Sequence, residues 1–293
     1  MQLRDNIFHN NLLKGKIVGN SEKSKNRHSK IKKAFICIAA ILGIVLVLAA
    51  VFYINIKSFT VNRLQSTVGQ DVYLMGTFHT DHFDAVSNYS VEEMLNAIQS
   101  INPDVVFIEA REENYEQYGV VDGPVDMCIA YCYCRDNDIP VEMVDYWKVN
   151  NESYIQNTTS DDRDDHIHQK IMEKLKLYDD KKILIICGFG HLYPQIDRLY
   201  DEGFKKDKIP NVSKLFKCNG KEFAYPSMIC DVWEQRTLFY ANTYPESIQA
   251  DETINEEVKS QWPVDKNHVF YDSQMKYCDL FRSNLLYISD LLK

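Results

Sequence analysis

The sequence contains no HExxH motif and no CxxC pair, two patterns that mark common zinc sites in proteins. Without them, a cysteine zinc cluster is excluded, and no metal site can be read directly from a motif. The chain also has no internal repeat and no low-complexity tract beyond its basic N-terminus. By length, residues 68–293 therefore correspond to one domain.

Charge is absent from residues 34–56, a run of 23 predominantly apolar residues. At about 1.5 Å per residue this run forms about 35 Å of helix, enough to cross a hydrocarbon core of about 30 Å. A cleaved secretory signal usually has only about 7–15 apolar residues before small residues at its cleavage site. Here Phe52 and Tyr53 stand where small residues would be needed, and no Cys follows to accept a lipid. We therefore expect a retained transmembrane helix over 34–56, in contact with the lipid bilayer.

The segment before this span is strongly basic. Residues 1–33 contain nine Lys and Arg against two acidic residues, a net charge of +7, so a chain of net charge −9 carries −16 over residues 34–293. Basic flanks stay on the cytoplasmic side, where they meet anionic lipid headgroups, so residues 1–33 are predicted to be a cytoplasmic tail. Residues 57–67 are then a linker, and residues 68–293 an extracytoplasmic domain at the cell membrane. The acidity of that domain argues against nucleic-acid binding.

Cysteine is unevenly placed. Seven of the eight cysteines lie outside the span, and because seven is odd, at least one is unpaired or intermolecular. Cys128, Cys132 and Cys134 fall on one predicted helix, where near neighbours are badly placed for a disulfide. We interpret most of these cysteines as small apolar core residues.

Short apolar runs predict buried strands of a parallel sheet at 72–75, 105–108 and 183–187, with a fourth strand at 141–144. Helices alternate with them and are expected at 90–102, 124–137, 161–178, after His191 and over 273–292. This alternation predicts an α/β fold, a mainly parallel sheet with flanking helices, preceded by one transmembrane helix. The first helix begins at a capping box formed by Ser90 and Glu93.

Polar residues follow each predicted strand at its carboxyl end: His79, Glu109 with Arg111, Asp145, and His191. In open α/β sheets, ligands bind in the crevice outside these strand ends, so a parallel sheet should bring the residues together. Each has an ordinary structural interpretation when taken alone, because a single His after a strand is more often a structural residue than a ligand. Their joint placement after separate strands favours a site.

Other polar clusters have simpler explanations. Residues 188–190, Gly-Phe-Gly, could be a tight turn, and the acidic run 161–165 complements a helix N-terminus. His166 and His168 lie two apart on a helix, do not share a face, and are expected to be solvated.

The chain resembles the TraB/PrgY and Tiki group, which shares features with erythromycin esterases and the haem-binding ChaN proteins. The residues that carry this resemblance are Gly-Thr-Phe-His at 76–79, Pro103 through Arg111, Arg163-Asp164, and Gly-Phe-Gly-His-Leu at 188–192. They cover residues 72–199 in the same order and with similar spacing. One departure is Asp145-Tyr146-Trp147, where the family often carries Asp-Arg. That departure weakens the case for an anionic substrate contact at this position.

The resemblance implies a hydrolase site, and the Tiki members are metal-dependent proteases. It implies His79, Glu109 and His191 as ligands of a divalent metal (Mn, Co or Zn), since two imidazoles and a carboxylate can hold such an ion with an open position for water. Glu109 is the alternative general base, and Arg111 and Arg163 would stabilise negative charge or orient Glu109. Without metal, the same set could act as in erythromycin esterases, with a His as general base.

Two other classes remain open. PrgY-like proteins are thought to bind peptide signals and ChaN-like proteins bind haem, so the resemblance also admits a binding protein. A scaffold with a decayed site is the third possibility, and the retained His79, Glu109, Arg111 and His191 argue against it. The sequence therefore favours a membrane-anchored extracytoplasmic hydrolase, a metal-dependent peptidase acting on a peptide or protein.

Overall fold

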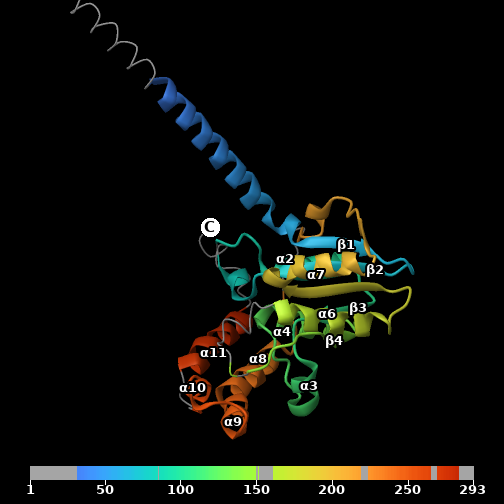
Figure 1. Cartoon of the computed structure of the whole chain (residues 1–293), viewed down its shortest axis with the longest axis vertical. Coiled ribbons are helices and arrows are strands. Elements are labelled where there is room, and N and C mark those ends of the chain that lie inside the picture. Colours follow the sequence, from blue (N-terminus) through green and yellow to red (C-terminus); the bar gives the residue numbers. More distant parts are fainter. Residues whose placement is uncertain are drawn as a thin grey trace, which may run out of the picture. The chain divides into compact units, whose positions relative to one another are not determined.

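The computed structural model describes residues 32–84, 86–149, 151, 161–218, 224–264 and 269–283. By its internal contacts the chain divides into two units, Met1–Ile54 and Asn55–Lys293. The described part of the first unit is helical, and the second contains the sheet and all the other helices (Figure 1).

An apolar helix occupies the start of the described chain. It runs over Lys32–Phe59, and among the described residues it is the one helix long and apolar enough to cross a membrane. Its large apolar side chains, from Phe35 to Ile54, are exposed. An exposed apolar helix of this length is consistent with a single membrane anchor.

The second unit is built on a six-stranded sheet of order β4-β3-β5-β2-β1-β6. Its strands are β1 (Val61–Gln65), β2 (Asp71–Thr77), β3 (Val105–Ile108), β4 (Val141–Met143), β5 (Lys182–Gly188) and β6 (Lys205–Asp207). The four predicted strands are present, and β4, β3, β5 and β2 are mutually parallel. The α/β class is thus confirmed, but the sheet is mixed, because β1 is antiparallel to both β2 and β6.

The antiparallel strand comes from a segment predicted as a linker. Residues 57–67 contain most of the 3-10 helix η1 (Ile56–Phe59) and the whole of β1, so the folded unit begins earlier than predicted. A short turn in which Gly69 has a φ of 93° joins β1 to β2. Strands connected by so short a turn can only pair antiparallel, which explains the mixed sheet.

Helices cover both faces of the sheet (Figure 1). The strands alternate between two apolar clusters, so that Val106 and Ile108 face one and Val105 and Phe107 face the other. The first face packs against α2 (Val91–Ile101), α4 (Val125–Asp136), α8 (Ile229–Leu238) and α11 (Val269–Arg282). The second packs against α6 (Asp161–Leu175) and α7 (Phe189–Asp201). The capping box at the start of α2 is confirmed.

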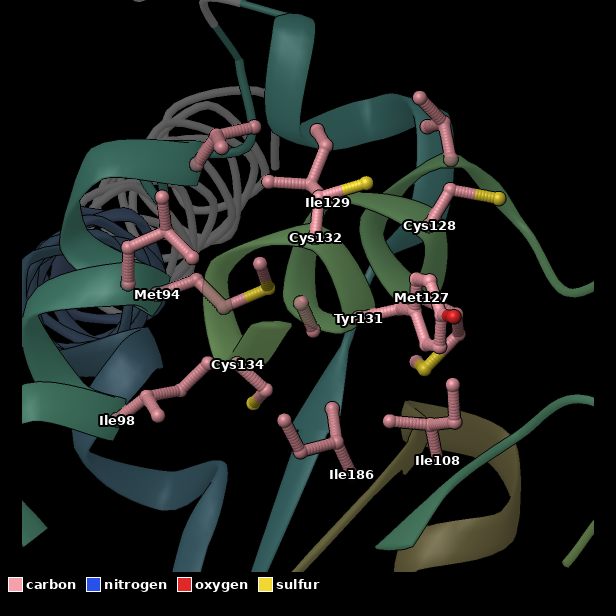
Figure 2. Packing of buried hydrophobic residues seen from close by; sticks show 14 of the residues in the cluster. Met94, Ile98, Ile108, Met127, Cys128, Ile129, Tyr131, Cys132, Cys134 and Ile186 are labelled. Atoms are coloured by element: carbon pink, nitrogen blue, oxygen red, sulfur yellow. The ribbon is translucent and has the colours of Figure 1, made fainter. Parts of the chain in front are cut away.

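The cysteines of α4 are core residues, as predicted. Cys128, Cys132 and Cys134 are buried and pack with Met94, Ile98 and Ile186 (Figure 2). Burial raises the pKa of the Cys128 thiol to about 12 and that of Cys134 to about 12 as well. Because the thiolate is the reactive form, these thiols are unsuited to nucleophilic chemistry.

The C-terminal region adds a helical layer at one side of the sheet (Figure 1). Helix α8 continues through the π-helix η4 (Phe239–Thr243) into α9 (Tyr244–Ala250), and α10 (Glu256–Lys259) follows. Residues of η4, α9 and α10 form a third apolar cluster with Trp147 and Trp262, whereas α8 packs in the first cluster. The predicted helix over 273–292 corresponds to α11, and residues 284–293 lie outside the described residues.

Candidate active site

The ends of the parallel strands surround a cavity of about 650 Å³. All five residues predicted for the site line it, namely His79, Glu109, Arg111, Arg163 and His191. Asp145, the remaining strand-end residue, lines it as well. The strand-end prediction therefore located residues that lie together, although the chain separates His79 from His191 by more than 100 positions.

Glu109 follows β3 directly, and its carboxylate is buried. Its Oε1 accepts a hydrogen bond of 2.9 Å from Nη2 of Arg163, and its Oε2 accepts one from the backbone N–H of Gly188. Burial alone would raise the pKa of Glu109, but the positive charges of His79 and Arg163 outweigh it and lower the pKa. Glu109 is therefore an ionised carboxylate inside the protein.

His79 lies just past β2 with a φ of 52°, in the left-handed region. Its Nδ1 is 3.2 Å from both carboxylate oxygens of Asp126 on α4, and its backbone N–H donates to the same group. Burial opposes the charged imidazolium, but Asp126 and, to a lesser degree, Glu109 raise the pKa of His79 to about 9. At neutral pH His79 is thus protonated, and a strained backbone of this kind is typical of functional positions.

His191 is in the first turn of α7 and is buried. Its Nδ1 lies 2.8 Å from Oδ1 of Asp164, and its Nε2 lies 3.0 Å from Nη1 of Arg163. Because a guanidinium can only donate, Nε2 accepts, and the ring proton resides on Nδ1. Both ring nitrogens of His191 are thus occupied, and its Nε2 helps to hold Arg163 in place.

Arg163 connects the buried groups of the site. Besides Glu109 and His191, it donates to Oδ1 of Asp145 at 2.7 Å and to the carbonyl of Tyr146 at 3.0 Å. Burial opposes its charge, but Asp145 and Glu109 raise the pKa of Arg163 above its usual value. Arg163 is thus a permanent cation that contacts the Glu109 carboxylate.

Arg111 has a different environment, although it lines the same cavity. It donates to Asp122, to the carbonyl of Trp147 and to the hydroxyls of Tyr240 and Tyr244. Its guanidinium also lies 4.9 Å from the Trp147 ring centre. Through its hydrogen bonds to Tyr240 and Tyr244, Arg111 connects the C-terminal layer to the ends of the strands.

Gly188 leaves room for the side chains of His79 and Glu109. A Cβ on Gly188 would stand 2.6 Å from Nε2 of His79 and 3.2 Å from Oε2 of Glu109. The φ of Gly188 is −55°, a value open to any residue, so the requirement for glycine here is one of space. The imidazole and the carboxylate therefore both lie against the position that a side chain on Gly188 would occupy.

A divalent metal does not fit this arrangement of donors. Nδ1 of His191 faces Asp164, and Arg163 donates to both Nε2 of His191 and Oε1 of Glu109. A guanidinium thus occupies the place between two of the predicted ligands. Within the described ranges, no group of three or more His, Cys, Asp or Glu side chains is placed to hold a metal ion.

One wall of the cavity is apolar and combines residues of the C-terminal layer with Pro124 and Trp147 from outside it. It is formed by Pro124, Trp147, Tyr240, Ala241, Pro245, Trp262 and Pro263. Trp147 and Trp262 contact each other with ring centres 5.7 Å apart. A charged end and an aromatic wall within one cavity of this size are typical of sites for small molecules or short peptide segments.

His166 and His168 lie outside the cavity lining. His166 stacks on Tyr146 with ring centres 3.9 Å apart, and His168 forms an ion-pair contact of 3.6 Å with Glu202. The expectation that both are solvated is met only in part, because the His166 side chain is 39% exposed but that of His168 is only 14% exposed.

Comparison of the chain with protein-family models, with curated proteins and with solved structures finds no match. The resemblance to the TraB/PrgY and Tiki group therefore stays a prediction based on motif residues. Function has to be argued from the site itself.

Proposed function

We propose that the chain is a membrane-anchored extracytoplasmic hydrolase that cleaves amide or ester bonds of a peptide or protein substrate by acid–base catalysis. The observation that carries this proposal is the convergence of an ionised Glu109 and a protonated His79 at the base of a cavity. Acid and base groups whose environments push their pKa values apart are typical of catalytic sites.

In the proposed reaction, Glu109 takes a proton from a water molecule as the water oxygen adds to the substrate carbonyl carbon. The bond to the leaving nitrogen or oxygen then breaks, and the leaving group takes the proton on Nε2 of His79. Asp126 keeps the imidazole oriented throughout through its contact with Nδ1. Transfer of a proton from Glu109 to His79 restores both groups, and the products are a carboxylic acid and an amine or alcohol.

The remaining charged residues of the site hold Glu109 and His79 in position. Arg163 fixes Glu109, and the pair of Asp164 with His191 fixes Arg163. Helix α7 begins at Phe189, and Gly188 and Gly190 at its N-terminus line the cavity. The positive end of this helix would stabilise the negative oxygen that develops on the carbonyl.

Turnover by the full-length protein in detergent tests the proposal. We expect a peptide panel followed by mass spectrometry to yield hydrolysis products, with cleavage unaffected by a chelator and no stoichiometric metal in the purified protein. Cleavage that is lost on chelation and restored by Mn²⁺, Co²⁺ or Zn²⁺ would establish the metal-dependent alternative. Peptide binding without cleavage would support a signal-binding protein, and a Soret band after haem addition a haem-binding one.

The orientation of the domain is a separate prediction. The net charge of +7 before an uncharged span places residues after 57 outside the cell. Protease added to intact cells is therefore expected to degrade the C-terminal domain and to leave an N-terminal epitope tag intact. Protection of the domain with loss of the tag would show the opposite orientation, and lysed cells in which both are degraded provide the control.

A further inference from the structure

Arg236 on α8 differs from the other cations that line the cavity. His79 pairs with Asp126, Arg111 with Asp122, and Arg163 with Glu109 and Asp145. Arg236 also lines the cavity, but in the described part of the chain it forms no ion pair. It is therefore a cation within a substrate-sized cavity whose charge no described carboxylate neutralises.

The Arg236 side chain is held in place without using its terminal nitrogens. Its Nε donates to the carbonyl of Gly123, and its guanidinium lies 4.6 Å from the Trp233 ring centre and 4.8 Å from that of Tyr240. Nη1 is buried and has no hydrogen-bond partner among the described residues. Arg236 as a whole is partly exposed and lines the cavity, so an anionic ligand can pair with its guanidinium without displacing a carboxylate. Because the group is already oriented, little further ordering is needed on binding.

Arg236 is also close to the reacting groups. A Cβ on Gly123 would stand 2.4 Å from the backbone carbonyl oxygen of Glu109, so Gly123 packs directly against the end of β3. Because Arg236 donates a hydrogen bond to the carbonyl of Gly123, its guanidinium is held beside the end of β3, which Glu109 follows. The aromatic wall formed by Trp147 and Trp262 lines the same cavity.

We infer that Arg236 binds the free C-terminal carboxylate of a peptide substrate, and that the enzyme removes a C-terminal residue with an aromatic or large apolar side chain. This inference rests on the proposed function. A carboxylate is favoured over a phosphate because Glu109, Asp122 and Asp145 line the same cavity and would repel a dianion more strongly than a monoanion. The aromatic wall then accommodates the side chain of the released residue.

Paired ligands that differ only in the carboxylate test the inference. N-acetyl-L-phenylalanine and its amide are titrated into full-length protein by calorimetry, and benzoylglycyl-phenylalanine and its amide are compared as substrates. We expect wild type and the E109Q variant to bind the acid at least tenfold more tightly than the amide. R236Q should bind both alike, R236K should retain part of the preference, and the control R198Q should match wild type. Arg198 pairs with Asp165 and does not line the cavity.

The outcomes separate this inference from the proposed function. Equal affinity of wild type for acid and amide, or no saturable binding of the acid at millimolar concentration, overturns the role of Arg236. A carboxylate preference that R236Q abolishes, with no cleavage by any variant, supports the Arg236 site and rejects the hydrolase. If the melting curve shows that R236Q does not fold, wild type and R236K are compared by the ratio of their affinities for the acid and the amide. A smaller ratio in R236K supports the inference, and an equal ratio overturns it.

Discussion

Replacement of Glu109 by Gln is expected to lower kcat/KM by about 10²–10⁴-fold while the domain stays folded. Gln has the size of Glu and can still accept from Nη2 of Arg163, but its amide cannot take a proton from water. Its NH₂ group would face the N–H of Gly188, two donors together, which costs about 1–3 kcal/mol of stability. Arg163 keeps Asp145 as its counter-charge. Initial rates and melting temperature, measured on the same samples, separate the catalytic loss from the structural one.

The matched control is E113Q, because Glu113 on the short helix α3 (Glu112–Tyr118) pairs with Lys170 at the surface and is mostly exposed. This variant should retain wild-type rates. The wild-type pH profile gives a second readout: His79 must be protonated to act as the acid, so kcat/KM should fall as the pH rises through about 9. On the acid side it should fall as Glu109 becomes protonated. Wild-type rates in E109Q would rule out Glu109 as the base.

The central strands were predictable because each is buried on both faces. β2, β3 and β5 are nearly continuous apolar runs, as expected of parallel strands covered by helices. β1 and β6 gave no such signal. β1 has the sequence Val-Asn-Arg-Leu-Gln, and β6 is Lys-Lys-Asp, with no apolar residue. Their extended form depends on pairing with a neighbouring strand, which local sequence does not encode.

The site was predictable only in part. The strand-end rule brought together the residues that follow strands, whereas Arg163 on α6 was predicted from the resemblance, and neither showed which partner each side chain would take. Asp126 and His79 are 47 positions apart, and Asp164 and His191 are 27 apart. Asp126 could have been noticed as the single charge in an otherwise apolar stretch of α4, whereas Asp164 was named in the Arg163-Asp164 pair without a role or a partner.

Asp164 shows why the partner of a side chain could not be predicted from the sequence. The acidic run 161–165 was assigned to the N-terminus of a helix, and α6 does begin at Asp161. Asp161 and Asp165 are exposed, whereas Asp164 is buried and binds both His191 and Gln195. Helix periodicity separates inward from outward positions only when the neighbouring element is known. Trp262 of the aromatic wall was missed because it follows α10 and no strand, whereas Trp147 was noted only as part of a departure from the family pattern.

Replacement of Gly188 by Ala is expected to have the second large effect on kcat/KM. It tests the geometry of the site more directly than removal of His79 or Glu109 would. The added methyl group would stand 2.6 Å from Nε2 of His79, inside van der Waals contact, so the imidazole must move away from Glu109. The backbone conformation of Gly188 suits Ala, and its N–H still donates to Glu109. We expect a loss of at least about 10²-fold in kcat/KM, since small misplacements of catalytic groups have such effects.

The same loop contains the control. Gly190 also lines the cavity, yet a Cβ there would meet nothing within 4 Å. G190A should keep wild-type kcat/KM and gain up to about 1 kcal/mol of stability from the higher helix propensity of Ala in α7. In G188A the melting temperature should change little, because the half-buried imidazole can swing into the cavity, whereas the pH limb near 9 should shift as His79 separates from Glu109. Equal activity in G188A and G190A would show that His79 and Glu109 do not have to converge for the reaction. The acid–base pair would then have to be sought elsewhere in the cavity.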